Sequence, residues 1–163
     1  MSHSEKFEEC CNQFNPSLWD EKTHHWTDKL FLKDSFPQIF HFPLPTMYKR
    51  TINRLWKQVQ QADAAPERNE FLLLAHDPTP WKAVLYMLVK HEVPRANNVR
   101  LSGTFISKVF NGPFYKIPQY LREMEEYLTK QNTSAVKYYF YFATCPACAK
   151  KYGYNYIVAF AEV

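Results

Sequence analysis

Four cysteines, placed in two pairs near opposite ends of the chain, have the most specific chemistry in this sequence. Cys10 and Cys11 are adjacent, and Cys145 and Cys148 form a Cys-x-x-Cys motif. Structural zinc sites use four nitrogen or sulfur ligands, often supplied as two such pairs. We therefore expect both ends of the chain to meet at one structural zinc ion, or a related thiolate-bound metal, held by these four thiols.

Other interpretations of the cysteines stay open. Adjacent side chains tend to diverge, so His24 or His25 could replace one of the N-terminal pair as a ligand. The thiols could also remain reduced and metal-free, or Cys145 and Cys148 could be a redox-active dithiol. A redox dithiol normally opens a helix, whose N-terminus lowers a thiol pKa. The sequence instead predicts a loop over residues 145–153, which disfavours redox chemistry.

Histidines and carboxylates between these ends are the candidates for proton transfer. His76 and Asp77 adjoin in a proline-rich loop, where they form either an acid–base pair or a turn-forming aspartate beside a solvated histidine. Glu92, at the end of an expected strand, is a candidate cleft carboxylate. His41, on a short expected strand, is either a hydrogen-bonded core residue or a ligand-binding residue. No Gly-x-Ser-x-Gly sequence is present, which argues against serine-hydrolase chemistry.

Aromatic residues are abundant, with 13 Phe, 11 Tyr and 4 Trp. On an extended strand at 136–143, Tyr139 and Tyr141 share one face because side chains alternate with a period of two. That row is either a half-buried surface or the lining of a ligand cleft, because pockets are mostly apolar and aromatic with a few polar groups. We take Trp81, Tyr139, Tyr141 and His41 as the candidate ligand-binding residues.

Composition and charge exclude several classes of function. With only 3 Gly, the chain has no room for a glycine-rich phosphate-binding loop. The net charge of +4 comes from residues 99–163, where 8 basic residues face 4 acidic ones, and this mild excess disfavours a nucleic-acid partner. No apolar run is long enough for a signal peptide or a membrane span, so we expect a cytoplasmic protein without a membrane partner.

The order of expected elements predicts an α+β fold built from duplicated strand–helix–strand–strand units, with helices on one face of an antiparallel sheet. We expect a single domain over residues 1–163, in which 1–36 is an N-terminal extension that is irregular over 1–28, 37–98 is the first repeat and 99–163 is the second. Strands are expected at 38–42, 70–75, 82–91, 99–109, 136–143 and 154–163. Helices are expected at about 46–64, capped by Thr46, and at 118–131.

Several motifs spread along the chain resemble those of known families. They are Cys10-Cys11, Phe14-Asn15-Pro16, Trp19-Asp20, 40–44 (FHFPL), 101–105 (LSGTF), 108–110 (KVF), Gly112-Pro113, 145–150 (CPACAK) and 152–156 (YGYNY). Together they resemble a family of uncharacterised bacterial proteins often labelled hydrolases. The Gly112-Pro113-Phe114 turn is also similar to that of gyrase-inhibitory-protein-like domains, which share their fold with SOUL haem-binding proteins.

This resemblance implies a pseudo-symmetric domain with a ligand cleft between its halves. The broader fold often carries a cleft carboxylate on the strand before the last loop, whereas here 137–142 (KYYFYF) has no acid. We therefore expect binding of a small apolar or aromatic molecule as the leading function. A hydrolase acting on a small electrophilic or ester-like substrate is the second possibility, and a metal-stabilised protein-interaction module is the third. An acid beside a tyrosine would favour the enzyme, and an exposed apolar patch without a cleft would favour the interaction module.

Overall fold

The computed structural model describes residues 14–67, 70–144 and 146–163. It comprises two compact units: unit 1 contains the described residues up to His25 together with Gly103–Val163, and unit 2 contains Trp26–Ser102. Two long strands, β1 (Lys22–Ile39) and β5 (Asn98–Asn111), contribute to both units. In chain order, each unit has a strand, a long helix and two further strands, which confirms the predicted duplicated α+β arrangement.

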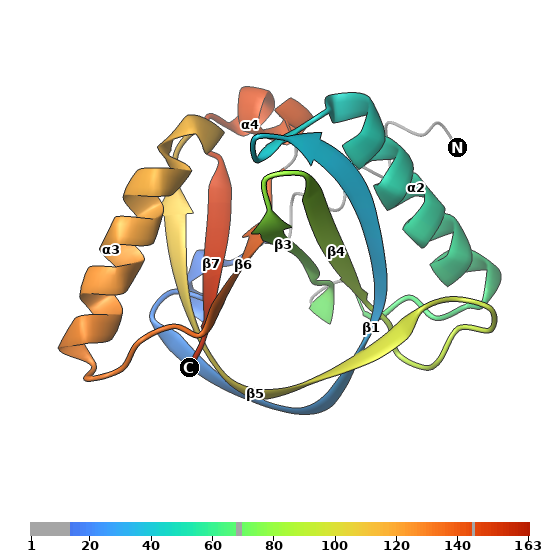
Figure 1. Ribbon diagram of the computed structural model, residues 1–163, viewed down its shortest axis with the longest axis horizontal. Helices are drawn as coiled ribbons and strands as arrows, with labels where there is room; N and C mark the ends of the chain where they lie inside the picture. The colour runs from blue at the N-terminus through green and yellow to red at the C-terminus, as the bar shows by residue number, and fades with distance from the viewer. Residues whose placement is uncertain (1–13, 68–69, 145) are drawn as a thin grey trace. The chain divides into compact units, whose positions relative to one another are not determined.

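Unit 2 is an antiparallel sheet with one helix. Strand β4 (Lys82–Leu88) pairs with β1 on one side and with β3 (Leu73–Thr79) on the other, and the short β2 (Phe42–Pro43) pairs with the end of β1. The helix α2 (Pro45–Gln61) follows β2 directly and lies alongside the strands of its unit (Figure 1).

The core of unit 2 forms where α2 meets one face of this sheet. Leu55 and Val59, one turn apart on the helix, are buried with Leu32, Leu85 and Met87 of the strands. Leu85 and Met87 are two residues apart on β4, so their side chains point to the same face. Burial of these aliphatic side chains is the main force holding α2 on the sheet.

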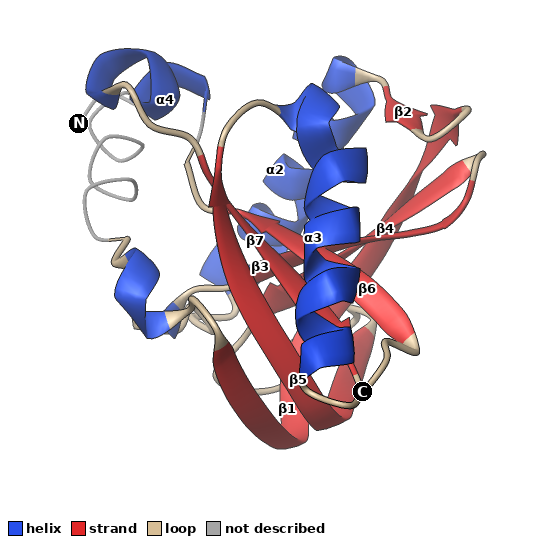
Figure 2. Ribbon diagram, turned by 90° about the vertical axis from the view of Figure 1, so that its left-hand side faces the viewer, coloured by secondary structure: helices blue, strands red, loops and turns tan. Residues whose placement is uncertain are grey.

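Unit 1 repeats this construction. Strand β7 (Tyr156–Glu162) pairs antiparallel with both β5 and β6 (Lys137–Phe142). The short η3 (Phe114–Lys116) leads into the helix α3 (Ile117–Lys130), which buries Tyr120, Met124 and Leu128 in a core cluster with residues of β5 and β7 (Figure 2). A short helix α4 (Pro146–Tyr152) precedes β7.

The N-terminal segment covers the other face of the unit 1 sheet. The rings of Trp19 and His24 lie 5.9 and 5.8 Å from that of Phe160, which is fully buried. Asp20 Oδ1 accepts a hydrogen bond from the backbone of Val109 at 3.0 Å, after the short η1 (Pro16–Leu18). The described part of this segment is therefore anchored by packing and hydrogen bonds to unit 1.

Several local expectations were wrong, and in the first two cases strand pairing extended an element. Residues 22–28 were expected to be irregular but begin β1, and β3 continues to Thr79 instead of ending near 75. The helix α2 begins at Pro45 with Leu44 in the capping position, so Thr46 is not its cap. Residues 146–152 form a helix where a loop was expected.

Within the described residues, none of the helices has the length and apolar character needed to cross a membrane.

Burial of Tyr48 on α2 predicts a loss of stability in alkaline solution. Its ring packs edge-on against Phe36 at 5.8 Å, and burial raises the pKa of its hydroxyl from 10.0 to about 12. Between these pH values the unfolded chain releases the proton and the folded chain retains it, so the free energy of unfolding falls as the pH rises. In urea unfolding from pH 9 to pH 11, Tyr48→Phe should reduce this fall by about 1 kcal/mol. An equal fall in both proteins would contradict the assignment.

Candidate functional site

Two tight turns lie side by side at one end of unit 2 (Figure 2). Phe40 and His41 connect β1 to β2, and Pro80 and Trp81 connect β3 to β4. Backbone hydrogen bonds join the two connections: Gln38 N donates to Trp81 O at 3.0 Å, and His41 N donates to Pro80 O at 2.9 Å. We call the five residues Gln38, Phe40, His41, Asp77 and Trp81 the turn site.

The first of these turns has a conformation that its residues do not favour. Phe40 and His41 have φ angles of 48° and 69°, both in the left-handed region. Two-residue hairpin turns with positive φ at both positions favour Asn-Gly and similar pairs, because a large side chain is strained there. Such strain costs about 1 kcal/mol or more per residue and concentrates at functional sites. The choice of Phe and His at this turn therefore points to a role for their side chains.

Asp77 reaches this turn from a bulge in β3. The register of β3 against β4 shifts between His76 and Thr79, and a bulge of this kind redirects a side chain and is common beside active sites. Asp77 Oδ2 lies 2.6 Å from Nδ1 of His41. A carboxylate accepts, so Nδ1 carries the proton and Nε2 of the neutral imidazole keeps its lone pair. The side chains are 53% and 45% exposed, which lets solvent and small molecules approach the pair.

The buried side chain of Gln38 fixes the orientation of Asp77. Its side chain is 5% exposed, and its amide donates to Asp77 Oδ1, to Thr79 O at 2.9 Å and to Lys82 O at 3.3 Å. One buried amide thus ties the carboxylate to the backbone of the β3–β4 turn. The arrangement resembles that of catalytic sites in which a base is oriented by a second group and that group by a third.

Two exposed aromatic rings lie beside the His41–Asp77 pair. The rings of Phe40 and Trp81 are 4.9 Å apart with an angle of 55° between their planes, and these residues are 66% and 55% exposed. Ile39, Phe42 and Leu44, on the same segment, are also exposed. An exposed apolar surface of this kind marks a place where another molecule binds.

The structure brings three of the predicted residues together and places the others elsewhere. His41, Asp77 and Trp81 form the turn site, with Asp77 hydrogen-bonded to His41, which lies in a turn where a strand was expected. Sequence reasoning missed Gln38 and Phe40. The sequence signal for this turn was that Phe40 and His41 separate two residues that favour strands, Ile39 and Phe42. Two residues are the length of a tight hairpin turn.

The remaining candidates have other environments. His76 is half-buried on β3, and Glu92 is exposed and pairs with Arg100 at 3.2 Å. Tyr139 is buried in unit 1 and contacts Phe105, with ring centroids 6.1 Å apart. Tyr141, on the same face of β6, is half-buried against Phe14 at 6.3 Å. A role of these residues in ligand binding or catalysis stays a prediction.

A serine–histidine pair in unit 1 looks catalytic but serves as an anchor. His24 Nε2 lies 2.7 Å from Ser107 Oγ, the geometry of a nucleophile and its base. Ser107 is fully buried, however, and its hydroxyl donates to Trp19 O at 2.5 Å. A substrate cannot reach this serine, and its hydroxyl proton is already donated to Trp19 O. Ser107 therefore fixes the N-terminal segment to β5.

The predicted zinc site lies outside the described residues. Cys10, Cys11 and Cys145 are not described, and nor is the side chain of Cys148. Among the described residues, no group of three or more His, Cys, Asp or Glu could hold a metal ion. The helix α4 begins at Pro146, so Cys148 lies in a helix and the expected 145–153 loop is corrected. The four-thiol zinc site stays a prediction.

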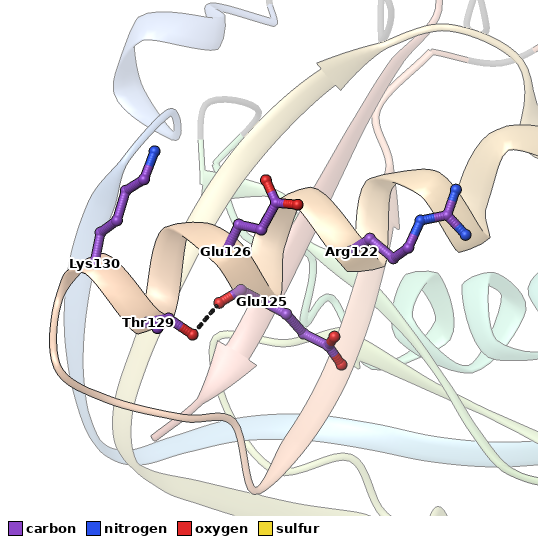
Figure 3. Close-up of a pocket in the computed structure, with 5 residues that line it drawn as sticks. All are labelled: Arg122, Glu125, Glu126, Thr129 and Lys130. Carbon is purple, nitrogen blue, oxygen red and sulfur yellow. Dashed lines mark hydrogen bonds between the residues drawn. The ribbon is translucent and has the colours of Figure 1, made fainter.

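An open hollow of about 590 Å³ on unit 1 carries no comparable chemistry. It is lined by Arg122, Glu125, Glu126, Thr129 and Lys130, all exposed on α3 (Figure 3). Thr129 Oγ1 donates to Glu125 O at 2.9 Å within the helix. Basic and acidic side chains alternate at a four-residue spacing here, which is typical of a solvated helix face.

Comparison with known proteins places the chain in a family. The family model described as bacterial hydrolase matches residues 1–163, so the chain belongs to this family. No curated protein matches the sequence. The family description is consistent with the resemblance inferred from the cysteine and LSGTF motifs.

Solved structures share the fold. The C-terminal domain of EcmrR has a TM-score of 0.67 and 8% identity, and the match covers 89% of this chain and 97% of that domain. An uncharacterised conserved protein from Listeria innocua has a TM-score of 0.62 and 12% identity, with 98% of each chain covered. A hydrolase from Listeria innocua has a TM-score of 0.61 and 14% identity, with 97% of this chain and 98% of that chain covered. At these identities the likeness concerns the fold alone.

The contacts of Gln38 predict a measurable contribution to stability. Gln38→Ala should lower the free energy of unfolding by about 1–3 kcal/mol, because a buried donor is lost from Asp77 and two backbone carbonyls. Gln60→Ala, at an exposed position of α2, is the matched control and should change it by less than about 0.5 kcal/mol. Chemical denaturation measures both values, and similar small effects would show that Gln38 does not hold the turn site together.

Proposed function

We propose that this member of the bacterial hydrolase family binds a small molecule with a flat apolar ring at the turn site of unit 2. The observation that carries the proposal is the exposed Phe40–Trp81 pair beside the oriented His41–Asp77 pair. A ring of the ligand would pack against these aromatic side chains, and His41 would contact a polar substituent of the ligand.

Physical chemistry favours this assignment. Aromatic contacts contribute about 0.5–1.5 kcal/mol beyond the area that they bury. Phe40 and Trp81 belong to turns joined by backbone hydrogen bonds, so little conformational entropy remains to be lost on binding. The strain at Phe40 and His41 is explained if their side chains must be presented together.

Binding can be measured with N-phenyl-1-naphthylamine, an uncharged aromatic probe whose fluorescence rises in apolar surroundings. We expect saturable binding that Trp81→Ala and Phe40→Ala each weaken by about tenfold, the loss of one good aromatic contact. Val136→Ala, which truncates an 82% exposed apolar residue of unit 1, is the control and should leave this binding unchanged. If the control weakens binding and the turn-site variants do not, the turn site is not the binding site.

Hydrolysis of an ester-like molecule is the second candidate function, and the geometry of His41 favours it. With its Nδ1 proton bonded to Asp77, His41 can accept a proton from water at Nε2. The water oxygen then adds to the acyl carbon, and the leaving alcohol oxygen takes the proton from the imidazolium. The products are a carboxylic acid and an alcohol, so atoms and charges balance without a cofactor. The family description supports the reaction class.

Hydrolysis of 4-nitrophenyl butyrate tests this candidate. His41→Ala should lower kcat/KM by about 100-fold, the usual contribution of a general base, and Asp77→Asn should lower it by a smaller factor. His25→Ala is the control, because this exposed histidine lies on unit 1, outside the turn site. Release of nitrophenolate at equal rates by the wild type and His41→Ala would show that surface groups cause the reaction, and would exclude His41 as the base.

A further inference from the structure

A second concave surface lies on unit 1, and it differs from the turn site in charge. The groove has a volume of about 590 Å³ and is lined by residues 111–115, Ala149 and 153–155. This volume is within the range of about 300–1,000 Å³ that is typical of small-molecule sites. We call it the unit 1 groove.

The walls of the groove are held in place by the backbone and by amide side chains. Asn155 Nδ2 donates to Gly112 O at 2.7 Å, Gly112 N donates to Asn155 O at 3.1 Å, and Asn155 N donates to Asn111 Oδ1 at 2.9 Å. Gly112 also allows a close approach, because a Cβ there would lie 2.1 Å from the hydroxyl oxygen of Tyr120. Three hydrogen bonds thus fix the two loops that form the groove.

The floor and rim of the groove are aromatic. Phe114 and Tyr115 line it and are 50% and 81% exposed. Phe114 packs against Phe142 with ring centroids 5.1 Å apart, which limits its movement. Tyr154, also in the lining, is stacked on Tyr152 at 5.6 Å. The groove therefore offers ordered ring surfaces to a ligand, with hydroxyl groups at its edge.

The segments that form the groove are exclusively basic in charge. Lys116 follows the aromatic pair, and Lys150 and Lys151 follow Ala149, whereas residues 111–116 and 149–156 contain no acid. Each of these lysines is one or two positions along the chain from a lining residue, and a positive charge attracts an anion over roughly the 8–10 Å Debye length of physiological solution. The turn site has no such excess, because Asp77 lies within it.

We propose that the unit 1 groove binds a small aromatic anion, with the ring against Phe114 and Tyr115 and the acidic group toward Lys116, Lys150 and Lys151. This site and its ligand class are separate from the turn site, and the proposal does not rest on the function proposed for that site.

The probe for this site is 8-anilinonaphthalene-1-sulfonate, which is the uncharged probe used above with a sulfonate added. We expect Tyr115→Ala and the triple variant Lys116→Gln, Lys150→Gln and Lys151→Gln each to weaken its binding by about tenfold, and 0.5 M salt to weaken it in the wild type. The triple variant Lys49→Gln, Lys57→Gln and Lys90→Gln is the matched control: it removes the same charge from exposed positions of unit 2 and should change binding by less than about twofold.

Each outcome of this titration decides for or against the groove. Selective loss in the groove variants, with binding retained in Trp81→Ala, supports it. Equal weakening in both triple variants would mean that the probe responds to overall charge, and loss in Trp81→Ala alone would move the anion to the turn site. Either result would overturn the proposal. The uncharged probe should bind the two triple variants equally, and its selective loss in the groove variant would indicate a damaged fold.

Discussion

The antiparallel register between β1 and β4 is the constraint on which the rest of the turn site depends. Pairing runs without interruption from Phe31 and Leu88 to Pro37 and Lys82. It buries alternate side chains of both strands beneath α2, and a slip of one residue would expose them. Because this register is fixed by core burial, the turns at the ends of the strands are brought together, and Gln38 lies where its amide reaches the β3–β4 turn.

The turn site shows how a stable scaffold can hold an unfavourable local conformation. The left-handed Phe40 and His41 would be costly in a short peptide, yet backbone hydrogen bonds to the neighbouring turn and the contact with Asp77 keep them in place. The bulge at Asp77 is a second local irregularity in the same site. Both irregularities lie near the ends of strands, where they do not interrupt the burial of β4 beneath α2. The site proposed for function and the core that stabilises the unit thus lie on different parts of the same strands.

Unit 1 also packs one helix on its sheet, and the N-terminal segment covers the other face of that sheet. Three consecutive residues of β5, Ser107, Lys108 and Val109, contact the segment Trp19–His24. The alternation of side chains places Ser107 on one face, under Trp19 and His24, whereas Ile106 belongs to the core beneath α3. A groove with fixed walls lies just beyond these residues, at the C-terminal end of β5, where Asn111 and Gly112 meet Asn155.

The sequence by itself determined the class of fold, the order of elements in both repeats and the membership of the chain in its family. Strands and helices with a strong hydrophobic period, such as residues 82–88 and 117–130, were predictable because their burial pattern is local. The sequence also identified His41, Asp77 and Trp81 as candidate site residues from their chemistry alone. Their meeting was decided by tertiary structure, since β-sheet pairing brings together His41 and Asp77, which are 36 residues apart in sequence. The same applies to Gln38, which looks like an ordinary polar strand residue until the fold buries its amide against three acceptors. The early start of β1 was missed because partners far away in the sequence, and not local preference, stabilise it.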